Sequence, residues 1–136
     1  MADVNWIAII VAAVVFNAIG FAWYSDSVFG KMWRDEVGMS KEKMKEASGN
    51  MGRMFAFMAV GSIVMAYVLS VVFGAFQVGT VMSALTVSFW VWLGFVATVL
   101  LNGVTYEMKT WRYYSINAGY QLVGLGAMGA TLVLLG

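Results

Sequence analysis

Four long apolar stretches, none with a charged side chain in its interior, constrain the fold of this chain more than any other feature. They cover about residues 4–24, 54–76, 81–106 and 114–135 of the 136. A helix needs about 20 apolar residues to cross the hydrocarbon core of a bilayer, so each stretch is long enough to span a membrane. The sequence therefore predicts an all-α integral membrane protein, a single domain (1–136) folded as a bundle of four transmembrane helices.

Composition and local pattern exclude the main alternatives. Hydrophobic residues make up 62% of the chain and charged residues 11%, far from the balance of a soluble protein. A β-barrel is disfavoured because residues 7–16 are apolar without alternation. The first stretch is too long for a signal peptide and has no basic residue before it, so we expect it to be retained. Because Pro is absent, we expect straight helices.

The basic residues predict the orientation of the bundle. All 8 lie either in the segment 25–53 or in the loop after the third stretch. The two ends of the chain and the turn at 77–80 have none. By the positive-inside rule the basic loops face the cytoplasm, which leaves both termini outside it.

The first loop, 25–53, is expected to contain structure of its own. In the segment 28–37, apolar residues recur at helical spacing opposite charged ones, which predicts a short amphipathic helix in the headgroup zone. Ser40 is a candidate N-cap for a second, charged helix over 41–47; the alternative is a solvated linker. Aromatic residues that flank the end of the first span are predicted interfacial anchors: Trp23, Tyr24, Phe29 and Trp33.

Small residues form stripes on the second and fourth spans, where they allow helices to approach closely. On the second span they are Ser62, Ala66, Ser70 and Gly74, and on the fourth they include Gly119, Gly126 and Ala130. These stripes pack either within the bundle or against another subunit. Because four short helices cannot bury every small-residue face, we expect a homo-oligomer or a larger membrane complex.

Polar and indole side chains within the spans are the candidate lining of a pocket. They are Asn17, Trp90, Trp92, Asn102, Asn117 and Gln121, and under the predicted topology the four amides lie in the cytoplasmic half. Converging amides would form a neutral pocket for a small hydrogen-bonding solute. The alternative is that each amide only joins two helices, which contributes about 0.6 kcal/mol.

No residue pattern predicts catalysis, a metal or a cofactor. The chain has no His and no Cys, which removes imidazole bases, thiolates and most metal ligands. Glu107 lies beside Lys109 and Arg112, an arrangement typical of a salt bridge. Met51, Met54 and Met58 share a helical face that could hold Cu(I), but Met is also a common gap-filler in packed helices. A net charge of +1 gives no indication of nucleic-acid binding.

Several short motifs lie within the predicted spans or beside their ends. They are Asn5-Trp6, Trp23-Tyr24-Ser25, Phe29-Gly30-Lys31 with Trp33, Trp92-Leu93-Gly94-Phe95 and Ala118-Gly119-Tyr120. In these motifs the chain resembles a bacterial membrane family catalogued as domain of unknown function 1761. It departs from the family pattern at Asp26, where Pro is frequent, and at Thr105-Tyr106-Glu107, where a Phe-Glu pair is common. The resemblance implies four spans and a bacterial inner membrane, but no activity, substrate or cofactor.

Two functions of different classes follow from these features. The first is a non-enzymatic inner-membrane protein that is a structural or accessory subunit of an assembly, with the lipid bilayer and other membrane proteins as its partners. The second is a small transporter or channel for a neutral or weakly charged solute, which requires the candidate lining residues to face one cavity. An enzyme would need Glu107 or Asp26 desolvated beside a pocket, and no motif supports one.

Overall fold

The computed structural model describes residues 5–25, 27–37, 49 and 51–136. The elements named here are α1 (Trp6–Trp23), α2 (Gly30–Val37), α4 (Met51–Ala75), α5 (Val81–Val91), the π-helical turn η1 (Trp92–Ala97), α6 (Thr98–Leu100), α7 (Asn102–Thr105) and α8 (Trp111–Leu135). The described residues contain no strand. The predicted charged helix at 41–47 and Asp26 lie outside the described residues.

Four helical segments are long and apolar enough to cross a membrane, as predicted: Trp6–Trp23, Gly52–Ala75, Val81–Thr105 and Trp111–Leu135. The all-α, multi-pass fold is therefore confirmed. N-caps mark two of the helix starts, because Thr80 and Thr110 each accept a hydrogen bond from the backbone N–H three residues on.

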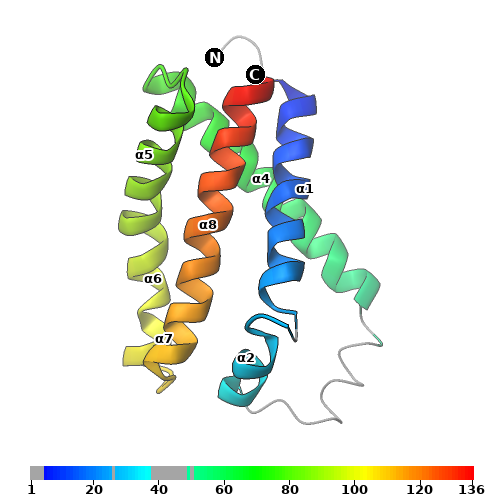
Figure 1. Cartoon of the computed structure of the whole chain (residues 1–136), viewed down its shortest axis with the longest axis vertical. Helices are drawn as coiled ribbons and strands as arrows, with labels where there is room; N and C mark the ends of the chain where they lie inside the picture. The colour runs from blue at the N-terminus through cyan, green and yellow to red at the C-terminus, as the bar shows by residue number, and fades with distance from the viewer. Residues whose placement is uncertain (1–4, 26, 38–48, 50) are drawn as a thin grey trace.

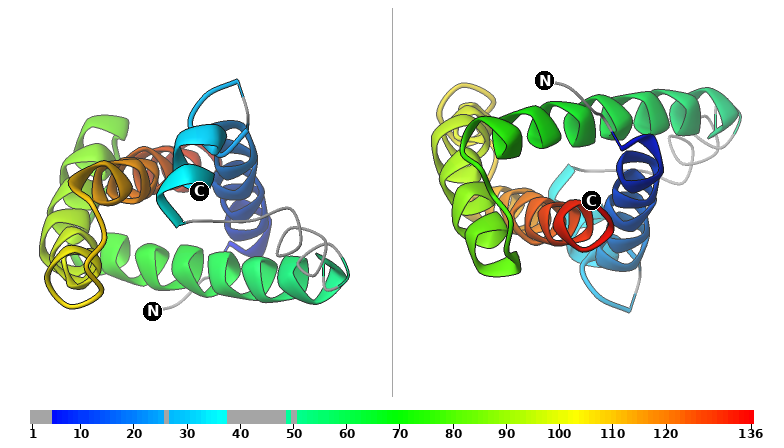
Figure 2. Two further views of the ribbon diagram at one scale, coloured as in Figure 1. Left: turned by 90° about the horizontal axis from the view of Figure 1, so that it is seen from below. Right: turned by 90° about the horizontal axis from the view of Figure 1, so that it is seen from above.

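The helices form one layer with a fourth helix crossing it (Figure 1). In the layer α8 lies between α1 and the segment α5–α7, and α4 crosses behind at a steep tilt (Figures 1 and 2). The start of α1 and the end of α8 lie at one end of the bundle, here called the terminal end, and α2 lies at the opposite end, the α2 end (Figure 1). The helix α8 is therefore the central helix of the layer, and α4 packs across one side of the layer.

Aromatic rings packed on glycines set the spacing of α1 and α8. A Cβ at Gly124 would lie 2.6 Å from the ring of Phe16, and a Cβ at Gly20 would lie 2.7 Å from the hydroxyl of Tyr120. Each helix thus contributes one ring and one glycine. The hydroxyl of Tyr120 donates to the Phe16 carbonyl at 2.9 Å, which fixes the register of the antiparallel pair.

The third span is not the straight helix that we expected. From Trp92 to Ala97 it widens into π-helix, and it is interrupted again at Leu101 before α7. No proline causes these irregularities. A π-helical turn inserts one extra residue into the helix and thereby rotates the side chains that follow it. The π-helix itself begins at Trp92, whose indole N–H donates to the carbonyl of Ala118 on α8 at 2.8 Å.

Candidate functional site

Asn17 joins α1 to α4. Its Nδ2 donates to the Ser62 hydroxyl at 2.9 Å, and that hydroxyl donates in turn to the carbonyl of Ala59 at 3.0 Å. Ser62 is buried, so the bond is shielded from the surroundings. The first of the predicted lining amides is therefore a joint between two helices.

Asn117 and Gln121 lie one turn apart on α8, but the structure gives them different surroundings. The hydroxyl of Tyr24, at the end of α1, donates to Asn117 Oδ1 at 2.5 Å. Gln121 is half-buried, and its side chain has no hydrogen bond to any residue that the structure describes. Gln121 is thus an amide inside a membrane span with unused donors and acceptors.

The remaining candidate lining residues are exposed or are bonded to the backbone of α8. Trp90 is 63% exposed on the outside of α5, and Asn102 is exposed where α7 begins. The indole N–H of Trp92 is satisfied by the Ala118 carbonyl. The structure therefore does not bring the six candidates together into a single lining.

The predicted anchors form an aromatic cluster at the α2 end. Trp23 contacts Phe29 with ring centroids 4.9 Å apart, and Tyr24 contacts Trp33 at 5.6 Å. Both α1 rings also approach Tyr120 of α8, at 6.5 Å and 5.5 Å. These side chains therefore hold α1, α2 and α8 together.

Trp23 reaches this cluster because α8 has no side chain in its way. A Cβ at Gly119 would lie 3.1 Å from the Trp23 ring, and the indole N–H of Trp23 donates to the Ile116 carbonyl at 2.9 Å. Through both contacts the ring packs against α8. Gly119 therefore packs against another helix of the same chain.

Helix α2 is attached to the start of α8 by its one half-buried carboxylate. Glu36 accepts a hydrogen bond from the Thr110 hydroxyl and lies 3.8 Å from the guanidinium of Arg112. Thr110 is the N-cap of α8, so the carboxylate also lies near the positive end of that helix. At the other end of α2, the Tyr24 and Ser25 carbonyls leave no room for a Cβ at Gly30.

Some residues of the small-residue stripes pack against other helices of the same chain. Ser62 and Ala66 are buried, and Gly126 lies against Leu85, which a Cβ would meet at 3.4 Å. Ala130 is half-buried. Ser70 and Gly74 instead border a cavity at the terminal end.

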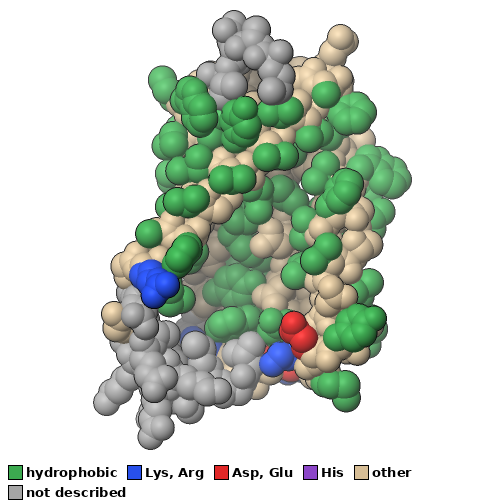
Figure 3. Space-filling model, turned by 180° about the vertical axis from the view of Figure 1, so that it is seen from behind, with side chains coloured by type: hydrophobic (Ala, Val, Ile, Leu, Met, Phe, Trp, Pro, Cys, Tyr) green, Lys and Arg blue, Asp and Glu red, His purple; other side chains and the backbone are tan. Residues whose placement is uncertain are grey.

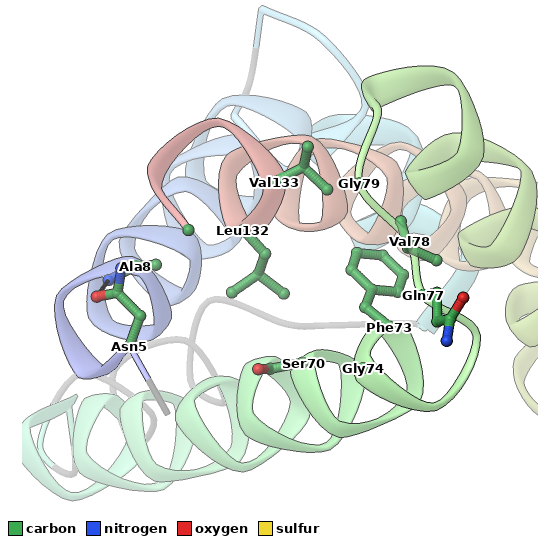
Figure 4. Close-up of a pocket in the computed structure, with 11 residues that line it drawn as sticks. Asn5, Ala8, Ser70, Phe73, Gly74, Gln77, Val78, Gly79, Leu132 and Val133 are labelled. Carbon is green, nitrogen blue, oxygen red and sulfur yellow. Dashed lines mark hydrogen bonds between the residues drawn. The ribbon is translucent and has the colours of Figure 1, made fainter. Parts of the chain in front are cut away.

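That cavity has a volume of about 400 Å³ and lies between the ends of α1, α4 and α8. Figure 4 shows Leu132 and Phe73 pointing into it, while Gln77 points away. At its edge Asn5 caps α1 and donates to the Leu135 carbonyl at 2.8 Å. Apolar side chains therefore point into the cavity, and a hydrogen bond between α1 and α8 lies at its edge.

A second hollow opens on the face behind α8, toward the α2 end. Figure 3 shows it between the diagonal of α4 and the column formed by the third span. It exists because α4 tilts out of the bundle: every residue from 52 to 61 is exposed. The start of α4 therefore projects beyond the other helices, as Figure 2 shows.

Comparison with known proteins gives a family for this arrangement. A family model described as "Protein of unknown function (DUF1761)" matches residues 7–133. The chain belongs to this family. No curated protein and no solved structure matches the chain.

Three of the motifs by which the chain resembled DUF1761 meet in three dimensions: Trp23-Tyr24-Ser25, Phe29-Gly30-Lys31 with Trp33, and Ala118-Gly119-Tyr120. Tyr120 packs on Phe16, with centroids 4.9 Å apart, and beneath it lie the rings of Trp23 and Tyr24. Gly20 and Gly124 were not among the residues expected from the sequence to join helices, although they allow the closest packing of α1 and α8. A signal was present, because on each helix an aromatic residue precedes the glycine by four: Phe16 precedes Gly20, and Tyr120 precedes Gly124.

Proposed function

We propose that this protein is a non-enzymatic structural or accessory subunit of a membrane assembly, and that it associates first with copies of itself. One observation carries the proposal: residues 52–61 of α4 project from the bundle with every residue exposed. Helices in lipid gain stability from close packing with other helices rather than from burial of apolar surface. A second subunit would supply the packing that this half of α4 lacks.

The exposed half of α4 has a face that suits such a contact. Gly52, Ala56 and Ala59 follow one another at intervals of four and three, which places them on one side of the helix. A Cβ at Gly52 would meet no atom within 4 Å. Two copies of this face could approach closely about a two-fold axis along the membrane normal.

The orientation belongs to the same proposal. The described basic residues Lys31, Arg34, Arg53, Lys109 and Arg112 all lie in or beside the loops at the α2 end. The positive-inside rule then supports a bacterial inner membrane with the α2 end in the cytoplasm and both termini outside.

The test compares two glycines of α4 that differ only in the face they occupy. Gly52 and Gly61 are both exposed with open space around a Cβ, and an offset of nine positions places them on opposite sides of the helix. Gly52→Leu, alone or with Ala56→Leu, should convert oligomers to monomers in native nanodiscs, measured by mass photometry. Gly61→Leu should leave their size unchanged. A wild-type chain that is monomeric without a co-purifying protein would contradict the proposal.

A transporter or channel is the second candidate, and one observation favours it: Gln121 is half-buried within a span, and its amide has no hydrogen-bond partner among the described residues. The two hollows are separated by a core in which Ile9, Ala66 and Met128 are 0% exposed. Transport would therefore require these helices to move apart. Uptake of a radiolabelled neutral solute into proteoliposomes would test this candidate.

A further inference from the structure

The hollow at the α2 end is bounded by helices that separate toward this end. The helix α4 has its main contacts with α1 and much smaller ones with α8 and α5. Below Ser62, which is 4% exposed, α4 leaves the bundle, and its next residues toward the α2 end are exposed. Figure 3 shows the resulting space behind α8.

Two amides lie at the same depth beside this hollow. The hydroxyl of Tyr120 meets the Phe16 carbonyl at 2.9 Å, and Asn17 and Gln121 are the residues that follow these two in the chain. The close packing of α1 on α8 therefore brings Asn17 and Gln121 to nearly the same level.

Both amides are also on the side of the α1–α8 pair that faces α4. Asn17 bonds to Ser62 of α4. Gln121 lies two turns from Met128 on one face of α8, and Met128 is fully buried in the core that includes Ala66 of α4. Because α4 departs below Ser62, Gln121 borders the space that α4 leaves open.

The hydrogen-bonding capacity of these amides exceeds what the described residues use. A primary amide offers two donors and two lone pairs. Asn17 uses one donor and Asn117 uses one acceptor, while Gln121 uses none. In hydrocarbon such unmade bonds are costly, so water is a better occupant of the space than lipid tails.

We propose that this hollow is a hydrated vestibule that binds a small uncharged solute with both hydrogen-bond donors and acceptors, such as an amide. Amide groups offer both functions, which matches a ligand that also has both. A neutral ligand is favoured because the three side chains that carry the argument, Asn17, Asn117 and Gln121, are all uncharged amides. The proposal concerns binding alone: it rests on the same amide as the transport candidate and names a ligand class for it, and it does not depend on assembly.

The absence of cysteine makes the hydration directly measurable. Gln121→Cys places one thiol in the hollow, and Val123→Cys places one at nearly the same depth about 200° around α8, where Val123 is 45% exposed. Only a thiol in water ionises and reacts with a membrane-impermeant methanethiosulfonate. We expect Gln121→Cys to react about tenfold faster or more, from the α2 side of oriented vesicles only. Equal and slow reaction of both variants would overturn the vestibule.

A second variant tests the ligand class and guards against misfolding. Asn117→Cys keeps both Asn17 and Gln121, so its modification should be slowed by bound acetamide. At twice the dissociation constant the rate should fall about threefold. Acetate and ethylammonium should not protect, and adding Gln121→Leu should abolish the protection. A reactive Asn117→Cys that acetamide does not protect would leave a hydrated hollow and overturn the proposed ligand.

Discussion

The two longest helices, α8 and α4, are both apolar enough to cross a membrane, yet they have opposite roles. In the most apolar 18-residue part of α8, 39% of the residues are buried, against 17% in α4. The buried helix has the two amides and the glycines that pack against side chains of other helices, whereas the glycines of α4 meet open space and α4 is the more apolar helix. Within a bilayer, hydrophobicity therefore does not predict which helix is central, because lipid is as apolar as a protein core. Small and polar side chains predict it better.

The largest expected effect comes from adding a side chain at Gly124 of α8, where α1 packs closely against it. Gly124→Leu would force side-chain atoms into the ring of Phe16, which a Cβ alone would approach to 2.6 Å. We expect the free energy of unfolding, measured by titration with a denaturing detergent, to fall by about 3 kcal/mol. The matched change in α4 is Gly61→Leu, which meets open space and should change stability little. Equal losses in the two variants would contradict the roles assigned to α8 and α4.

The length of the apolar stretches was enough to predict the four spans, because crossing a bilayer places a direct requirement on length. The boundaries were close: the fourth stretch was expected at 114–135, and α8 runs from Trp111 to Leu135. Which side of each span faces its neighbours was harder to predict. Trp23 and Tyr24 are predicted to anchor in the headgroups, which stays a prediction, and the structure adds that they pack against α8 and α2.

The arrangement of the candidate site was harder to predict than the packing of the spans. Sequence identified Asn17, Asn117 and Gln121 as polar residues within spans, but the side toward which each amide points depends on the register of α1 and α8. That register is set by Gly20 and Gly124, whose role is to lack a side chain. A missing side chain gives no hydropathy signal. Only the spacing of the aromatic residues that pack on these glycines, Phe16 and Tyr120, could have indicated the register.

An effect of intermediate size is expected on the other face of α8, from a buried hydroxyl on α5. Ser88 is 1% exposed, and its Oγ finds no hydrogen-bond partner among the residues described. It lies where a Cβ at Gly129 would come within 2.6 Å. Ser88→Ala removes an unpaired polar atom and should raise the free energy of unfolding by about 1 kcal/mol in the same titration. A decrease would show that the hydroxyl is bonded in the membrane.

A smaller effect is expected from one hydrogen bond between α8 and α1. Tyr120→Phe keeps the ring on Gly20 and Phe16 but removes the bond to the Phe16 carbonyl. That bond should contribute about 0.6 kcal/mol, the average for hydrogen bonds between membrane helices. Tyr120→Leu removes the ring as well and should cost more in the same detergent titration. If Phe and Leu were equivalent at this position, packing on Gly20 would not be what holds α8 to α1.

The smallest effect is expected where α8 meets α2, outside the tightly packed part of the layer. Glu36→Gln removes the charge that faces Arg112, whose side chain is 60% exposed and therefore strongly screened by water. We expect about 0.5 kcal/mol or less, seen as faster hydrogen exchange at the amides of α2 with no change in the middle of α8. Because salt screens an exposed pair, high salt should reproduce this effect in the wild-type chain and add little in the variant. Faster exchange along the whole of α8 would instead make α2 part of the central packing, and the contrast between α8 and α4 would no longer describe how the bundle is held together.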